Sequence, residues 1–168
     1  MKKYIIVLCL ALVLSLMFVS CEKESGNNDE PYTSSYSVEE VHEKLIENDF
    51  FKDGVVYSSF ENSLSELYAE YYFGSKEILD GVVSYTVILS PTTDVCEVGV
   101  FKIENDSARD ALLDGFNFRR DALISTHTNY SEKDLEISQN LTTGLFSDVV
   151  YYIATSDNTL VEEIIKND

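Results

Sequence analysis

Few side chains in this sequence could act as a nucleophile or a base. It contains two histidines and three cysteines, and of these Cys96 and His127 are the pair whose chemistry could support covalent catalysis. Such a dyad requires a histidine at the end of a helix to reach a cysteine near the middle of a strand. Cys96 has apolar neighbours, which is typical of a small buried core side chain. We therefore predict that these two residues form no catalytic pair.

A metal site is the other chemistry that a histidine could support. His42 lies among Glu39, Glu40 and Glu43. These residues fall in the first turns of a predicted helix, where acidic side chains interact favourably with the helix dipole in any case. The sequence shows no zinc-ligand spacing and no glycine-rich phosphate loop. It predicts no catalytic residues, no metal and no cofactor.

Cys21 follows an N-terminal segment of the export type. Two lysines precede an uncharged apolar stretch at residues 4–19, which is shorter than the roughly 20 residues that span a bilayer. The run FVSC at residues 18–21 resembles the lipobox of bacterial lipoproteins, in which the cysteine thiol receives a diacylglyceryl group. We expect residues 1–20 to be a signal peptide and Cys21 to be lipidated. An ordinary cleaved signal and an uncleaved anchor are the alternatives.

The chain beyond Cys21 divides into a tether and a domain. Residues 22–36 combine Gly, Asn, Ser and Pro with almost no aliphatic side chain, a composition typical of a flexible linker. Residues 37–168 hold enough apolar sequence for one globular domain. Once Cys21 is acylated and the signal is removed, Cys96 has no intrachain disulfide partner.

The charge of the chain excludes some partners. Its formal net charge is −18, and removal of residues 1–20 takes away two lysines and no acid, so the charge falls to −20. Nucleic acid and anionic lipid surfaces would both repel such a chain. We therefore expect membrane attachment through the lipid on Cys21, and no nucleic-acid partner.

Periodicity predicts the elements of the domain. Capping signatures precede amphipathic helices, and runs of β-branched and aromatic residues indicate strands. The expected helices are residues 38–48, 63–74, 106–126 and 157–166, and the expected strands are residues 82–89 and 95–103, a weaker one at Leu135 and Ile137, and residues 148–154. Residues 90–94 and 142–144 are expected turns.

These elements define an α+β fold. After two N-terminal helices the order is ββα-ββα, which predicts a two-layer sandwich in which amphipathic helices cover an antiparallel sheet of about four strands. In the second helix, helical spacing places Tyr68 and Tyr71 on the buried face with Leu64 and Leu67. An exposed aromatic platform for stacking on a glycan is the alternative for these tyrosines.

Several of these segments together resemble a known family. They are the strand EVGVFKIEN at residues 97–105, the helix that bears Arg119 and Arg120, Tyr130, and the strand VVYYIATSD at residues 149–157. With the lipobox and tether, they resemble the clostridial-type lipoproteins of the family called domain of unknown function 4358, over roughly residues 38–166. The resemblance implies an exported, membrane-tethered domain and no particular activity. Either Arg119 or Arg120 corresponds to the family's single arginine.

Arg119 is the charge whose position most needs a partner. At 100° per residue it falls inside the apolar stripe of the long helix, between Ala108 and Leu123. Strand alternation places Glu97 on the same side as Phe101, so the two charges meet if that side of the strand faces the helix. We predict a buried Glu97–Arg119 pair. A snorkelling arginine and an anion-binding arginine are the alternatives.

The sequence therefore predicts a lipid-anchored domain on the extracytoplasmic side of the membrane. We expect it to bind or assist an envelope protein or a wall ligand without catalysis of its own. A cell-wall-modifying enzyme is the first alternative, and a deep cleft with converging titratable residues would favour it. A structural spacer or inhibitor lipoprotein is the second, and a broad exposed apolar patch would favour that.

Overall fold

A five-stranded antiparallel sheet forms the centre of the computed structural model, which describes residues 32 and 34–166. The expected signal peptide, Cys21 and most of the tether lie outside these residues. The strands are β1 (Val55–Ser58), β2 (Val82–Leu89), β3 (Glu97–Ile103), β4 (Thr142–Phe146) and β5 (Val149–Ala154), arranged in the order β1-β2-β3-β5-β4. The helices are α2 (Val38–Glu47), α3 (Glu66–Phe73), α4 (Asp106–His127), α5 (Glu132–Gln139) and α6 (Asn158–Lys166).

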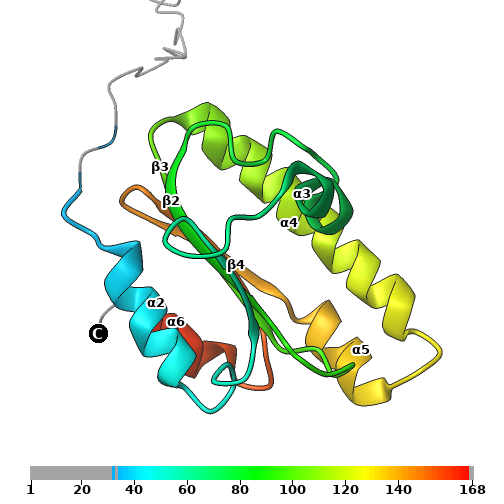
Figure 1. The fold of residues 1–168 in the computed structure, drawn as a ribbon. Coiled ribbons are helices and arrows are strands. Elements are labelled where there is room, and N and C mark those ends of the chain that lie inside the picture. Colours follow the sequence, from blue (N-terminus) through cyan, green and yellow to red (C-terminus); the bar gives the residue numbers. More distant parts are fainter. Residues whose placement is uncertain (1–31, 33, 167–168) are drawn as a thin grey trace, which may run out of the picture.

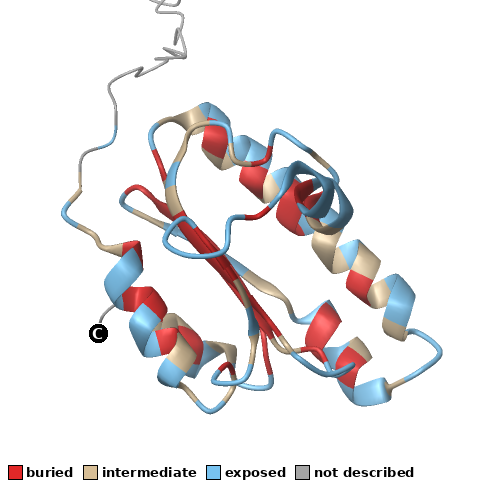
Figure 2. Cartoon of the chain, in the orientation of Figure 1, coloured by how far each residue is buried: buried red, intermediate tan, exposed pale blue. Residues whose placement is uncertain are grey.

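The α+β class, the antiparallel sheet and its cover of amphipathic helices are confirmed, and the helical cover extends to both faces of the sheet. Helices α3 and α4 pack on one face, and α2 and α6 on the other (Figure 1). Buried residues follow the central strands and the inner side of each helix (Figure 2). Strand β3 shows the division: Phe101 packs towards α4, whereas Val98 and Val100 pack towards α2 and α6.

The predicted strand at Leu135 and Ile137 is wrong, because these residues lie in helix α5. Their alternation mimics a strand, but the buried residues of α5 are Asp134, Ile137 and Ser138, which follow helical spacing. Ser131 caps the helix, and its side chain accepts a hydrogen bond from the backbone N–H of Asp134.

Residues 142–144, predicted as a turn, belong to strand β4 at the edge of the sheet. Gly144 lies opposite Tyr151, whose ring would collide with any side chain at that position. The glycine therefore makes room for a cross-strand ring, and the chain turns later, at Ser147, where φ is 51°. Strand β1, which the sequence analysis did not predict, adds the fifth strand at the opposite edge.

The predicted burial of Tyr68 and Tyr71 is also wrong. Helix α3 begins after Ser65, and it buries Ala69 and Phe73 instead. The relative exposures of Tyr68 and Tyr71 are 45% and 70%. Ala69 allows the helix to approach closely while Phe73 enters an aromatic core, so the larger tyrosine side chains point away from the core.

The last residues of the expected tether pack on the domain. The Nζ of Lys102 donates to the carbonyl oxygens of Ser34 at 2.8 Å and of Tyr36 at 3.0 Å. The hydroxyl of Ser34 donates to Asp148, and that of Tyr36 donates to the carbonyl of Ile165 at 2.6 Å. Residues 34–36 thus belong to the folded unit rather than to the linker.

Candidate functional site

An ion pair between the sheet and α4 forms one wall of the candidate site. Glu97 begins β3, and Arg119 lies in the buried stripe of α4. The Nε and Nη2 of Arg119 donate to the two carboxylate oxygens of Glu97 at 2.9 and 2.7 Å. The side chains are 14% and 5% exposed. This is the buried pair predicted from the helix phase, whereas Arg120 makes an exposed contact with Asp121 at 3.6 Å.

Aromatic rings surround this pair. The guanidinium carbon of Arg119 lies 4.9 Å from the centre of the Tyr72 ring, a cation–π contact. Burial by itself lowers the pKa of Arg119, but the hydrogen bonds and charge of Glu97 outweigh this effect and raise the pKa above its ordinary value. The arginine is therefore a permanent cation held in one orientation.

Tyr152 lies next to the ion pair on strand β5. Its hydroxyl is buried and makes no hydrogen bond with the described residues. Burial, together with the charge of Glu97, raises the pKa of Tyr152 well above its ordinary value. Gly99 lies opposite Tyr152, and a side chain there would collide with the tyrosine ring. The hydroxyl is thus a neutral group beneath the charged pair.

A surface cleft opens beside the pair, between the β2–β3 loop and the C-terminal end of α4. It consists of two adjoining pockets, of about 170 and 650 Å³, which share Thr93, Asp94 and His127. The smaller pocket also contains Tyr72, Ser90, Thr92, Glu97 and Arg119 in its wall, and the larger one Thr126, Tyr130, Ser131 and Asp134. Side chains from five segments of the chain therefore meet in one cleft.

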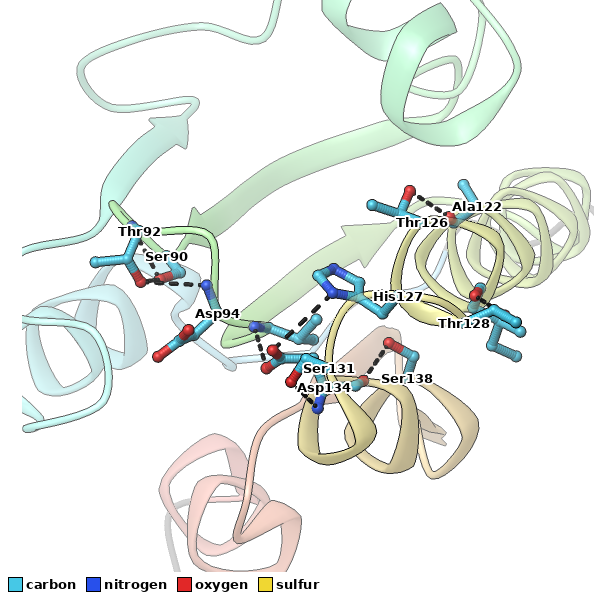
Figure 3. A network of polar contacts seen from close by, with 12 residues as sticks. Ser90, Thr92, Asp94, Ala122, Thr126, His127, Thr128, Ser131, Asp134 and Ser138 are labelled. Carbon is cyan, nitrogen blue, oxygen red and sulfur yellow. Dashed lines mark hydrogen bonds and ion pairs between the residues drawn. The ribbon is translucent and has the colours of Figure 1, made fainter.

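Local hydrogen bonds hold the loop side of this cleft. The hydroxyls of Ser90 and Thr92 are 2.9 Å apart, and the backbone N–H of Asp94 donates to the Thr92 hydroxyl at 3.3 Å. Such side-chain turns stabilise a loop without a sheet ladder. Figure 3 shows this loop opposite the end of α4, with the His127 ring projecting into the space between them.

His127 and Asp134 connect α4 and α5 on the other side of the cleft. The Nδ1 of His127 lies 4.0 Å from a carboxylate oxygen of Asp134, whose other oxygen accepts the backbone N–H of Val95 at 2.9 Å (Figure 3). Burial by itself raises the pKa of Asp134, but hydrogen bonds from Ser131 and Val95 and the interaction with His127 lower it overall. Asp134 thus remains ionised and ties α5 to the start of β3.

Cys96 and His127 both line the smaller pocket, but the position of the Cys96 thiol does not suit a catalytic pair. The thiol of Cys96 donates to the carbonyl of Phe50 at 3.4 Å and packs with the core on the opposite face of the sheet. Burial and the neighbouring Glu97 raise the pKa of Cys96 to about 11. A thiol with that pKa is a poor nucleophile near neutral pH.

His42 lies far from the cleft, under β2. Its Nδ1 is 2.9 Å from the Thr86 hydroxyl, and its Nε2 is 3.7 Å from a carboxylate oxygen of Glu61. The acids beside it in sequence do not join it in a metal site. Within residues 32 and 34–166, no group of three His, Cys, Asp or Glu side chains is placed to hold a metal ion.

The tyrosines of α3 make a separate aromatic surface. Tyr68 and Tyr71 are exposed with Leu67 beside them, and their rings contact the ring of Tyr72 with centroid separations of 6.1 and 5.1 Å. Phe118 of α4, 47% exposed, lies against Gly74 at the end of α3. We call Leu67, Tyr68, Tyr71 and Phe118 the α3 surface.

The sequence contained a signal for helix α5, which carries Asp134 to the cleft, but the strand predicted at Leu135 and Ile137 led us to overlook it. Ser131 followed by Asp134 is the spacing that starts a helix. Asp94 and Thr93, by contrast, fall in a turn, and only their spatial position opposite His127 gives them a shared role.

No protein-family model, no curated protein and no solved structure matches this chain. The fold and the cleft thus define it in general terms: an α+β domain with a polar surface cleft beside a buried ion pair. None of the helices within residues 32 and 34–166 is long and apolar enough to cross a membrane.

Proposed function

We propose that this chain is a membrane-anchored extracytoplasmic lipoprotein whose domain binds a ligand in the cleft between the β2–β3 loop and the end of α4. Attachment occurs through lipid on Cys21, after removal of residues 1–20. Membership of the family called domain of unknown function 4358 is part of this proposal. It rests on the resemblance of two strands, at residues 97–105 and 149–157, and of the arginine-bearing helix between them. The lipobox and the apolar stretch before it support the anchor.

One observation supports the binding role above the others. Two of the charged side chains that line the cleft are already held in place before any ligand arrives: Arg119 by Glu97, and Asp134 by the backbone N–H of Val95. Fixed polar groups lower the entropic cost of binding, because they need not be ordered by the ligand. A cavity of about 650 Å³ is within the size range of small-molecule sites.

Site-specific photo-crosslinking in intact cells tests the binding role. A photoreactive residue at Thr93, which is exposed at the cleft, should form adducts that increasing amounts of isolated wall or envelope extract suppress. The matched control is Ser107, also exposed, in the first turn of α4. Because the 22 residues of α4 span about 33 Å, Ser107 lies far from His127 at the other end. Equal adducts at both positions would exclude the cleft.

Metabolic labelling tests the anchor separately. Cells that express the full chain are given a clickable palmitate analogue, and wild type is compared with Cys21→Ala. Label should enter wild type and be absent from the variant. Equal labelling of the two chains would rule out lipidation at Cys21, whatever the cleft binds.

A wall-modifying enzyme is the second candidate, since His127 and Asp134 face one another in the cleft. A carboxylate that hydrogen-bonds an imidazole orients it as a general base, and the 4.0 Å between these two side chains would have to shorten for Asp134 to do so. Release of soluble fragments from purified wall by the wild-type domain, lost in His127→Asn, would favour this function. The structural spacer is a third possibility, to which the exposed α3 surface lends support.

A further inference from the structure

The cleft offers hydrogen-bonding groups of both kinds. Donors come from Arg119, whose side chain is 14% exposed: Nε and Nη2 bind Glu97, whereas Nη1 makes no hydrogen bond with the described residues. Acceptors come from the carboxylate of Asp94, which is exposed at the loop. Hydroxyl groups, which both donate and accept, line the rest of the polar wall at Ser90, Thr92, Thr93, Thr126 and Ser131.

The charges in the wall argue against a charged ligand. An anion would face Asp94, Glu97 and Asp134, and the chain as a whole carries a formal charge of −18. An ammonium group would find one carboxylate without a partner among the described residues, that of Asp94, and the guanidinium of Arg119 in the wall of the same pocket would repel it. The other two carboxylates already interact, Glu97 with Arg119, and Asp134 with Val95 and His127. The hydrogen-bond donors and acceptors of the wall that remain available therefore suit neutral hydroxyl groups.

Aromatic rings supply the apolar part of the wall. Tyr130 is 87% exposed at the edge of the larger pocket, and Tyr72 lies in the wall of the smaller one. Tyrosine combines an apolar ring face with a polar hydroxyl. A pyranose ring has the complementary chemistry, with C–H groups on its faces and hydroxyls around its edge.

We infer that the cleft binds a neutral saccharide, with hydroxyls accepting from Arg119 and donating to Asp94 while a sugar face packs on Tyr130. This inference rests on the proposed binding role of the cleft and names the chemical class of its ligand. The same chemistry could come from a wall glycan or from a free sugar, and two neutral probes distinguish these sources: chitotriose in its fully N-acetylated form, and maltotriose, which has no N-acetyl groups.

Calorimetric titration of the domain from residue 22 with each probe, combined with one variant in the cleft and one on the α3 surface, tests the inference. Tyr130→Ala should weaken binding about tenfold or more, because the stacking surface is lost. Leu67→Ala truncates a similarly exposed side chain of the α3 surface that lines neither pocket, and it should leave affinity unchanged. Asp94→Asn, which keeps the shape of the side chain but loses its charge, should weaken binding as well.

The outcomes separate the inference from the function on which it rests. Tighter binding of chitotriose supports a wall glycan, and tighter binding of maltotriose a free sugar. If Leu67→Ala abolishes binding and Tyr130→Ala does not, saccharide binds the α3 surface and the inference is overturned. It is equally overturned if neither probe binds at about 10 mM. In that case suppressible crosslinking at Thr93 would still uphold the cleft as a site for another ligand.

Discussion

Glu97 and Arg119 join the first residue of β3 to the buried face of α4 through two parallel hydrogen bonds of 2.7 and 2.9 Å. The bidentate geometry matches the planar guanidinium fork to a carboxylate. Both side chains are largely withdrawn from solvent, at 14% and 5% exposed, so water hydrates either charge poorly if the other is lost. The pair thus fixes how α4 sits on the sheet at the position where the cleft opens.

Removal of one member of this pair should be costly. Glu97→Gln or Arg119→Met alone should each lower the free energy of unfolding by about 3 to 5 kcal/mol, because the remaining charge stays buried without a partner. The double variant should recover part of that loss. Urea denaturation of the four proteins gives the coupling energy directly.

The exposed pair Lys76–Glu70 is the control for this cycle. Its atoms are 3.5 Å apart and both side chains are more than half exposed, so its coupling should stay below about 1 kcal/mol. Losses below about 0.5 kcal/mol at Glu97 and Arg119 would show that their charges are hydrated in solution, contrary to the structure.

The contacts of residues 34–36 predict where the domain can be truncated. A chain that begins at Ser37 loses the two bonds to Lys102 and those to Asp148, so it should be less stable by about 2 to 4 kcal/mol than one that begins at Ser34. Thermal melts of the two chains, with a chain from Glu22 as reference, measure the difference. Identical melting curves for all three chains would show that residues 34–36 add no stability and belong to the tether.

Asp148 should make stability depend on acid. Burial by itself raises the pKa of Asp148, but hydrogen bonds from Ser34 and the charge of Lys102 lower it below its ordinary value. A folded-state pKa below the unfolded one stabilises the domain above about pH 4, and this contribution disappears as the pH falls through the folded pKa. Urea midpoints at neutral pH and near pH 3 should therefore differ more in wild type than in Asp148→Asn. The same pH dependence in both proteins would assign the acid sensitivity to other groups.

The thiol of Cys96 should be inert in the native domain. With its pKa raised to about 11 by burial and Glu97, little thiolate exists at neutral pH. In a chain that begins at residue 22, where Cys96 is the only cysteine, Ellman's reagent should label it slowly, and rapidly once urea is added, with free cysteine as the reference. Fast labelling of the folded protein would reopen the case for a Cys96–His127 dyad.

Local patterns were sufficient for the hairpin of β2 and β3, for α4 and for β5, since each has a long periodic or β-branched run. They were insufficient for α5 and β4. Leu135 and Ile137 alternate as in a strand, but Ile137 turns inward with Asp134 and Ser138. Gly144 looks like a turn residue, yet it is a strand residue beneath the ring of Tyr151, a partner that local sequence does not specify.

Helix α3 illustrates a limit of periodicity itself. Leu67, Tyr68 and Tyr71 are as apolar as the residues that α3 buries, so hydrophobicity alone does not define the inner face. The surface on which α3 packs decides which of its faces is buried. Phe73 fits among Phe101, Phe116 and Tyr152, and Ala69 permits close approach, which turns the tyrosines outward.

By itself the sequence determined the helix phase that puts Arg119 inside an apolar stripe, and the strand alternation that gives it Glu97, because both depend on fixed backbone periods. Only the tertiary structure decided that the β2–β3 loop, the end of α4 and the start of α5 enclose one cleft. Asp94 is distant in sequence from His127 and Asp134, and no local pattern specifies which helix end faces which loop. That juxtaposition comes from how α4 and α5 pack on the finished sheet, which is a property of the whole core.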